Sequence, residues 1–177
     1  MNQAALTIAP EALSDTAVSE LADLLVETVA ADGSVGFRHP LSPEAARAYW
    51  RKALQDAETG GRVVFGARHL GHLVGTVTLF LDTPDNQLHR AEIWKMMVHP
   101  RLRRAGIADA LLRAGEAEAL MRGRTLLNLD TVTGGPASRL YERAGWIRCG
   151  DIPDYALTPM GAWTGTTIYY KALAPAA

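Results

Sequence analysis

Apolar residues in the first third of the chain recur every three or four positions, a spacing typical of helices with one buried face. In the first such segment these residues are Val18, Leu21, Leu24, Leu25 and Val29. Ser14 can cap the start of this helix, and Gly33 suits the left-handed conformation that often follows a helix end. A second helix is predicted over residues 42–58, and a short strand over residues 5–9 precedes both helices.

From residue 62 onward the apolar pattern changes to an alternation of period two, which indicates strands. The expected strands span residues 62–68, 73–81, 91–99, 126–132, 146–152 and 166–171. Two further helices are expected over residues 108–122 and 136–143. Hairpins come first and strand–helix–strand units follow, so we predict a mixed α/β (α+β) fold in a single domain over residues 1–177.

Composition narrows the class of protein. With 177 residues, 48% of them hydrophobic and 21% charged, the chain matches a globular domain that buries a core without metals or disulfides. Cys149 is the single cysteine, which excludes an internal disulfide, and we expect it in the core. No run of about 18 apolar residues predicts a membrane span, and the N-terminal residues lack the pattern of a signal peptide. We therefore expect a cytoplasmic protein with no membrane partner.

The charged residues are unevenly distributed along the chain. The formal net charge of −1, from 18 basic and 19 acidic residues, lacks the basic excess that is typical of nucleic-acid binding. Residues 95–104 nevertheless contain four basic residues and no acidic one. Apart from the neighbouring Trp94, this run has no interleaved aromatic residues on which bases could stack. We therefore expect a small phosphorylated ligand and no nucleic acid.

The basic run lies between a strand that ends at Pro100 and a helix that starts near Gly106. Backbone N–H groups at a helix start have no partner within the helix, so they bind anions well. Gly106 permits a tight turn and a close approach of a ligand to the backbone. Arg101, Arg103 and Arg104 add charged donors around the same position. The segment is therefore a candidate diphosphate site, and a solvated loop is the alternative.

Two segments resemble signatures of the GCN5-related N-acetyltransferase (GNAT) superfamily. Residues 103–108, Arg-Arg-Ala-Gly-Ile-Ala, are similar to its acyl-CoA pyrophosphate loop, Arg/Gln-x-x-Gly-x-Gly/Ala. Residues 137–146, Ala-Ser-Arg-Leu-Tyr-Glu-Arg-Ala-Gly-Trp, resemble its second signature, Ala-x-x-Leu-Tyr-x-x-x-Gly-Phe/Trp. Two positions depart from the family pattern: Ala108 replaces a glycine that many members have, and Gly134 stands where the second signature often begins with asparagine.

Shorter segments along nearly the whole chain resemble the tabtoxin resistance protein subgroup of this superfamily. They are residues 25–29, 34–37, 89–92, 129–131, 152–155 and 167–171. Members of the subgroup acetylate a small β-lactam toxin. The resemblance therefore points to an enzyme whose acceptor is a small molecule.

The resemblance to the superfamily implies the GNAT fold, a mixed and mostly antiparallel sheet of about six or seven strands flanked by about four helices. The strands over residues 93–98 and 126–132 would form its splayed parallel pair, with a bulge over residues 96–98. Acetyl-CoA would be the cosubstrate. The residues that the resemblance assigns to it are Met96, Met97, Val98, Arg103, Arg104, Ala105, Gly106, Ile107, Ala108, Ala137 and Tyr141. The five histidines show no metal-ligand spacing, so no metal is expected.

The resemblance also implies catalytic roles. Tyr141, in the Leu-Tyr of the second signature, would be the general acid next to the CoA sulfur, with packing of its helix on the sheet as the alternative. Asp130 is the favoured general base and Glu92 the second candidate. An ion pair with Arg90 or Lys95 would instead give Glu92 a structural role. A carboxyl group between apolar neighbours can have a raised pKa, which suits a base.

For the acceptor, the expected contacts are Phe37, Trp94 and Asp130. The implied reaction is direct transfer of an acetyl group to the amine or hydroxyl of a small molecule, such as an amino-acid-like toxin or antibiotic. The alternatives are an acetyltransferase that acts on proteins or polyamines and a non-catalytic acyl-CoA-binding sensor. The chain is expected to be a monomer or a homodimer.

Overall fold

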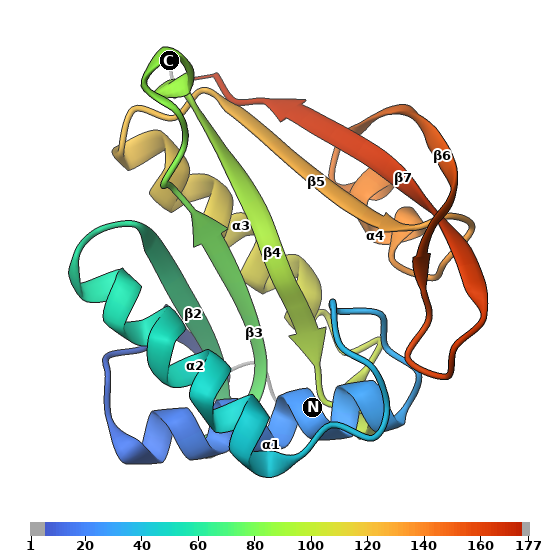
Figure 1. Cartoon of the computed structure of the whole chain (residues 1–177). Helices are drawn as coiled ribbons and strands as arrows, with labels where there is room; N and C mark the ends of the chain where they lie inside the picture. Colours follow the sequence, from blue (N-terminus) through green and yellow to red (C-terminus); the bar gives the residue numbers. More distant parts are fainter. Residues whose placement is uncertain (1–5, 175–177) are drawn as a thin grey trace.

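A seven-stranded sheet with strand order β1-β2-β3-β4-β5-β7-β6 runs through the protein (Figure 1). The structure is a computed structural model, and it describes residues 6–174. The strands are β1 (Leu6–Pro10), β2 (Arg62–His69), β3 (His72–Phe80), β4 (Arg90–Val98), β5 (Leu126–Val132), β6 (Ile147–Leu157) and β7 (Trp163–Ala172). Neighbouring strands are antiparallel except for the parallel pair β4 and β5. The predicted mixed, mostly antiparallel sheet is confirmed.

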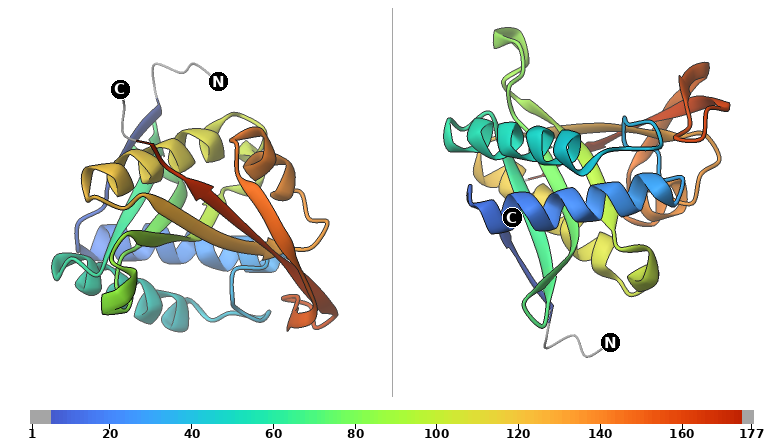
Figure 2. Two further views of the ribbon diagram at one scale, coloured as in Figure 1. Left: turned by 90° about the horizontal axis from the view of Figure 1, so that it is seen from above. Right: turned by 60° about the horizontal axis from the view of Figure 1, so that its bottom comes forward.

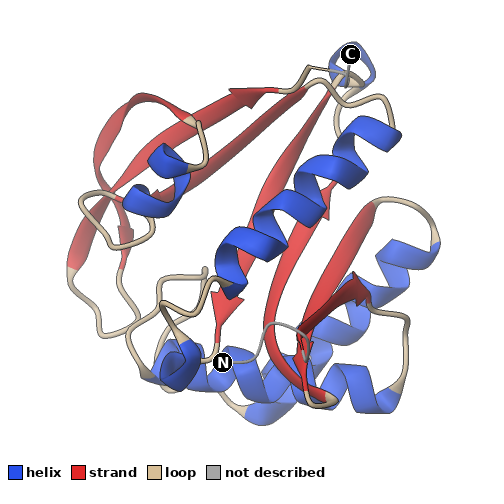
Figure 3. Ribbon diagram, turned by 180° about the vertical axis from the view of Figure 1, so that it is seen from behind, coloured by secondary structure: helices blue, strands red, loops and turns tan. Residues whose placement is uncertain are grey.

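Two helices cover each face of the sheet (Figures 2 and 3). The helices α1 (Asp15–Ala30) and α2 (Pro43–Glu58) lie side by side on one face, and α3 (Ile107–Met121) and the short α4 (Ser138–Arg143) lie on the other. The two N-terminal helices begin as predicted, because the hydroxyls of Ser14 and Ser42 each accept a backbone N–H bond of 3.1 Å from the first helical turn. Within residues 6–174, no helix is long and apolar enough to cross a membrane.

The C-terminal hairpin is longer than its sequence pattern predicts. The first strand, β6, was expected to end at residue 152 but continues through Pro153 to Leu157. A break in the β6–β7 register between Ile152 and Ala156 accommodates the proline. Since β6 is an edge strand with mostly exposed residues, its apolar alternation is weak, and Cys149 is exposed instead of lying in the core as expected. At the other end of the sheet, residue 5 of the predicted first strand lies outside the described residues.

The parallel pair β4 and β5 is joined over only a short length. Three residues of β4, Arg90 to Glu92, pair with residues 126–128 of β5, after which the two strands diverge (Figure 1). The remainder of β5 continues to pair with β7 as far as Val132. The predicted splay of this pair is therefore present.

A bulge interrupts β4 beside the splay. Trp94 and Met97 pair with Thr78 and Thr76 of β3, so two residues, Lys95 and Met96, lie opposite a single residue of β3. The bulge thus begins one residue before the predicted position, and Lys95 has a φ of 52°, in the left-handed region.

The bulge changes which face of the sheet the following residues meet. Before it, Ala91 and Ile93 belong to the core between the sheet and α3. Met97 has the same parity as these two residues, yet it is buried in the core under α1 and α2. Side chains alternate strictly along a regular strand, so one inserted residue accounts for the change of face.

Helix α3 packs unusually close to β3 at Gly75. A Cβ added there would lie 3.0 Å from the carbonyl oxygen of Met97 and 3.1 Å from methyl carbons of both Ile107 and Leu111. Gly75 therefore fixes how closely the start of α3 approaches the end of β4, which determines the shape of the loop between them.

We expect Gly75→Ala to lower the free energy of unfolding by about 1–3 kcal/mol, because the methyl group overpacks a buried contact between backbone and helix. Gly150→Ala is the matched control, since a Cβ at Gly150 in β6 would meet nothing within 4 Å. Urea unfolding of the two variants measures the difference. Equal stability of both variants would show that α3 can move away from the sheet without cost.

Candidate active site

The loop that connects β4 to α3 is shaped by contacts at its start and by two left-handed residues at its end. The His99 side chain accepts a hydrogen bond of 3.2 Å from the Arg101 backbone N–H, and its Nε2 lies 2.9 Å from a carboxylate oxygen of Glu27 on α1. The φ angles of Arg104 and Gly106 are 65° and 81°. These turns lead the chain directly into the first turn of α3.

This loop presents unpaired backbone donors to the surface. Within residues 6–174, no protein group accepts a hydrogen bond from the N–H groups of residues 103–108. The Arg103 and Arg104 side chains are exposed, and within the same part of the chain neither forms an ion pair. Asp109, in the first turn of α3, is paired with Arg113 at 2.7 Å, which compensates its negative charge. The loop therefore has the free donors and positive charge that a diphosphate requires.

Asp130 lies on β5 where this strand has separated from β4. Its carboxylate is exposed to solvent, and Oδ2 accepts a hydrogen bond of 2.8 Å from the Thr166 hydroxyl on β7. One oxygen is thus oriented by a neighbouring strand while the group remains accessible. Sequence analysis did not single out Thr166, because the contact joins residues far apart in the chain.

Tyr141 on α4 is 4% exposed, and its ring lies against Trp146 and Tyr169 with centroid separations of 5.9 and 5.8 Å. Burial raises the pKa of the Tyr141 phenol, and the negative charge of Asp130 raises it further. The phenol is therefore protonated at neutral pH.

A polar cluster behind Tyr141 holds α4 against the rest of the protein. Glu116 on α3 accepts a hydrogen bond of 2.9 Å from the Trp146 indole and pairs with Lys171 at 2.8 Å. Lys171 also donates to the carbonyl oxygen of Ala144 at the end of α4, at 2.7 Å. Tyr141 therefore packs its helix on the sheet, which is the structural role that the sequence left open for it.

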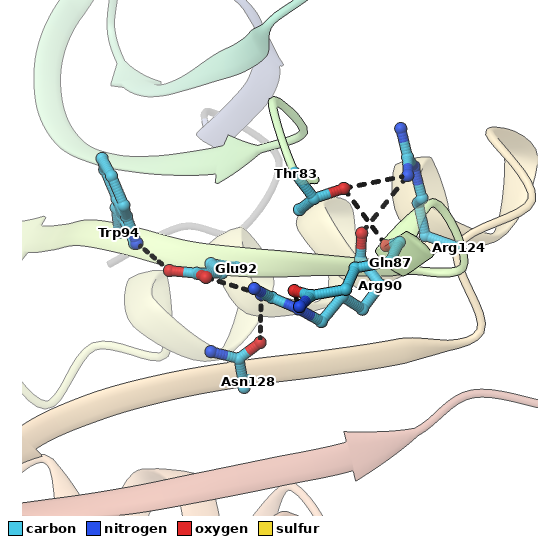
Figure 4. Close-up of polar contacts among 7 residues, drawn as sticks. All are labelled: Thr83, Gln87, Arg90, Glu92, Trp94, Arg124 and Asn128. Carbon is cyan, nitrogen blue, oxygen red and sulfur yellow. Dashed lines mark hydrogen bonds and ion pairs between the residues drawn. The ribbon is translucent and has the colours of Figure 1, made fainter. Parts of the chain in front are cut away.

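Glu92 lies at the closed end of the splay, where both of its oxygens are engaged (Figure 4). One accepts from Arg90 at 2.6 Å, and the other accepts from the Trp94 indole at 2.8 Å. Arg90 also donates to Gln87 at 2.6 Å and to Asn128 of β5 at 3.1 Å. The ion pair that the sequence left open is therefore with Arg90.

A second arginine ties the chain around this network. Arg124, just before β5, donates to the hydroxyl of Thr83 at 3.5 Å and to the carbonyl oxygen of Arg90 (Figure 4). It also donates to the carbonyl oxygen of Leu88. These contacts fasten the turn before β4 to the start of β5. The two strands are thus joined at one end by side chains as well as by their short ladder.

Aromatic side chains line the face of the splay that carries α1 and α2. Trp94 stacks on Phe80 with 4.1 Å between ring centroids and 6° between planes, and the Arg62 guanidinium lies 5.4 Å from the Phe80 ring. Phe37, in the loop between α1 and α2, packs edge-on against Tyr49 of α2 at 5.3 Å. Phe37 and Trp94, two of the three predicted acceptor contacts, are both half-buried.

Lys95 does not belong to the basic cluster in which the sequence placed it. The bulge turns its side chain toward the aromatic residues, and its Nζ lies 5.5 Å from the Phe37 ring and 5.4 Å from the Tyr49 ring. The cluster before α3 therefore contains only arginines. A sequence signal existed, since Lys95 is the one charged residue between Ile93 and Val98.

Within the described part of the chain, no three His, Cys, Asp or Glu side chains are grouped so that they could hold a metal ion.

We expect Glu92→Gln to lower the free energy of unfolding by about 1–3 kcal/mol, because Arg90 is then left with its charge partly buried and uncompensated. The Glu92 and Arg90 side chains are only 22% and 23% exposed, so solvent screens this pair weakly. Glu58→Gln, exposed at the end of α2, is the control. Urea unfolding gives both values, and an unchanged stability of Glu92→Gln would contradict a structural role for the pair.

Comparison with known proteins identifies the family. The chain superposes on yncA of Salmonella typhimurium, whose structure contains its cofactor acetyl-CoA, with a TM-score of 0.79, 18% identity and coverage of 98% of this chain and 96% of that one. A ribosomal-protein-alanine N-acetyltransferase of Brucella melitensis superposes with a TM-score of 0.78 and 22% identity, covering 94% of this chain and 99% of that one. A GCN5-related N-acetyltransferase of Kribbella flavida superposes with a TM-score of 0.78 and 20% identity, covering 96% of this chain and 99% of that one. These structures share the fold. The model of the acetyltransferase (GNAT) family matches residues 24–146, and the chain therefore belongs to this family.

Proposed function

We propose that this chain is an acetyl-CoA-dependent acetyltransferase that transfers the acetyl group directly to the amine or hydroxyl of a small molecule. The observation that supports this most is the splay of β4 and β5. Asp130 lies on β5 beyond the point where the two strands part, its charge acts on the Tyr141 phenol of α4, and the loop with free N–H donors follows the end of β4. A candidate anion site, a separation of two strands and a candidate acid–base pair are the features that acetyl transfer from acetyl-CoA needs.

The residues present fit the parts of acetyl-CoA. The N–H groups of residues 103–108, with Arg103 and Arg104, would hold its diphosphate. The pantetheine arm would lie between two segments. One is the backbone of Met96, Met97 and Val98, and the other is the start of α4 with Ala137 and Tyr141. When bound, acetyl-CoA supplies an activated acyl group on a thiol of low pKa that leaves readily.

Asp130 would take the proton from the attacking amine or hydroxyl, because it is exposed, oriented by Thr166 and free of any basic partner within ion-pair distance in residues 6–174. Tyr141 would give its proton to the leaving sulfur, since its raised pKa keeps the phenol protonated. Glu92 remains the second candidate for the base. Its engagement with Arg90 and Trp94 favours a role in orienting β4.

The acceptor is proposed to be small and amino-acid-like, as in the tabtoxin resistance subgroup that the sequence resembles. Phe37 and Trp94 would line its side of the splay. A polyamine would meet the positive charges of Lys95 and Arg62 in the same region, which disfavours a purely cationic acceptor.

Acetyl-CoA should stabilise the protein against thermal unfolding, by roughly 2.7 kcal/mol at 100 times its Kd. Arg103→Ala is expected to weaken binding about tenfold, because one charge-assisted contact to the diphosphate is lost. Arg51→Ala, exposed on α2, is the charge-matched control and should bind as the wild type does. A thermal-shift titration tests all three proteins, and the absence of any shift with the wild type would refute the proposed function.

Asp130→Asn should lower kcat by about 100-fold or more while the acetyl-CoA-induced thermal shift is kept, because only the proton acceptor is removed. Asp151→Asn is the control, since Asp151 likewise accepts from a β7 threonine, Thr167, at 2.7 Å. Release of free thiol, screened over amino acids, dipeptides, aminoglycosides, polyamines and β-lactam analogues, measures turnover. Near-full turnover by Asp130→Asn, or a large loss only in Glu92→Gln, would assign the base to Glu92; binding without any turnover would indicate a sensor.

A further inference from the structure

Lys95 differs from the other lysines of this chain in having no charged partner. The sequence has three lysines. Lys52 pairs with Asp56 at 3.0 Å, and Lys171 pairs with Glu116 at 2.8 Å. Lys95 is half-buried, yet within residues 6–174 no carboxylate lies within ion-pair distance of it and no group accepts a hydrogen bond from it. An ammonium has three donors, so this group has capacity for a ligand.

The surroundings of Lys95 orient the ammonium without satisfying its donors. The rings of Phe37 and Tyr49 lie together on one side of it, with centroids 5.3 Å from each other and 5.5 and 5.4 Å from Nζ, which is the distance of a cation–π contact. Gly36 leaves the space beside it, since an added Cβ there would lie 3.2 Å from Nζ. The Ser-Val-Gly-Phe segment, residues 34–37, therefore forms a wall against which this ammonium is fixed.

The backbone of Lys95 adopts a conformation that is unfavourable for a residue with a side chain. Its φ of 52° lies in the left-handed region, which is sterically unfavourable for a non-glycine residue. Glycine would relieve that strain at a bulge. Strained residues of this kind are concentrated at functional sites, and here the strain directs a lysine side chain to the acceptor side of the splay.

Lys95 faces one charge of opposite sign, that of Asp130, on the neighbouring strand of the splay. Burial lowers the pKa of the Lys95 ammonium, the negative charge of Asp130 on the opposite strand acts against this, and the positive charge of Arg62 lowers the pKa further. Lys95 on β4 and Asp130 on β5 both lie beyond the last residue pair of the two strands, Glu92 and Asn128, and within residues 6–174 no ion pair joins them. A molecule with a carboxylate at one end and an amine at the other matches this pair in sign at both ends.

We propose that Lys95 binds the carboxylate of an amino-acid-like acceptor and thereby directs the acceptor amine toward Asp130. This inference rests on the proposed function and adds the residue that selects the acceptor class. Lys95 takes no part in proton transfer, and its contribution is to orientation.

Kinetics on matched acceptors test the proposal. Each amino acid or dipeptide that is acetylated is compared with its carboxamide, which keeps the amine and removes the negative charge. The wild type should favour the carboxylate form at least tenfold in kcat/KM. Lys95→Met should abolish that preference, mainly through a higher KM for the carboxylate form, and Lys52→Met, an equal change of charge on α2, should keep it. A preference that is absent in the wild type or retained in Lys95→Met would overturn the proposal.

A second measurement does not depend on turnover. In NMR spectra, protein labelled with ¹³C at lysine Cε gives three lysine signals. The signal that is missing from the Lys95→Met spectrum belongs to Lys95. The twenty amino acids and alanyl-alanine are titrated against their carboxamides. At least one carboxylate should move the Lys95 signal saturably while its carboxamide does not. If acetyl-CoA stabilises the protein but no carboxylate moves this signal, this inference is wrong and the proposed function stands; if acetyl-CoA gives no stabilisation, the proposed function itself fails.

Discussion

The separation of β4 from β5 is the constraint on which the rest of the site depends. The two strands share a ladder of three residue pairs, and each then keeps only its outer neighbour, β3 or β7. Backbone N–H and C=O groups that face the gap have lost their partners within the sheet, and such groups require others. A ligand that carries amides along its length could supply them, which is why we propose that the pantetheine arm of acetyl-CoA binds at this interruption of the sheet.

Side chains decide where the separation begins and what lies on each side of it. Arg90 joins Glu92 to Asn128 across the closed end, so the strands cannot drift apart there. At the other end Gly75 admits α3 close to the sheet, while Glu116 holds α4 through Trp146. In the proposed site the two segments that resemble the family signatures bind the same ligand, although about thirty residues separate them in the sequence. Each of the two motifs is a weak indication of acetyl-CoA binding by itself, and the two together are a stronger one.

The sequence predicted the elements whose apolar pattern is set by burial on one face. The core helices, the inner strands and the start of α3 were placed within a few residues because periodicity reports burial directly. It failed at β6, an edge strand whose exposed side chains leave little alternation and whose register break accommodates Pro153. The resemblance added the splay and the candidate acid and base, which no local pattern contains. Neither the apolar pattern nor the resemblance could predict the side chains that contact Glu92 and Asp130, because these networks join separate strands.

Lys95 shows why one inserted residue matters for both substrates. A regular β4 would place residues 93, 95 and 97 on one face, and the lysine would then point into the core against α3, where an unpaired charge is prohibitive. The bulge removes that conflict by turning Lys95 toward Phe37 and Tyr49, and it also passes Met97 to the opposite core. The same irregularity breaks the β3–β4 ladder at the residues that would meet the pantetheine arm. The separation from β5 frees the backbone on one edge of β4, and the bulge on the other edge turns Lys95 to the proposed acceptor side.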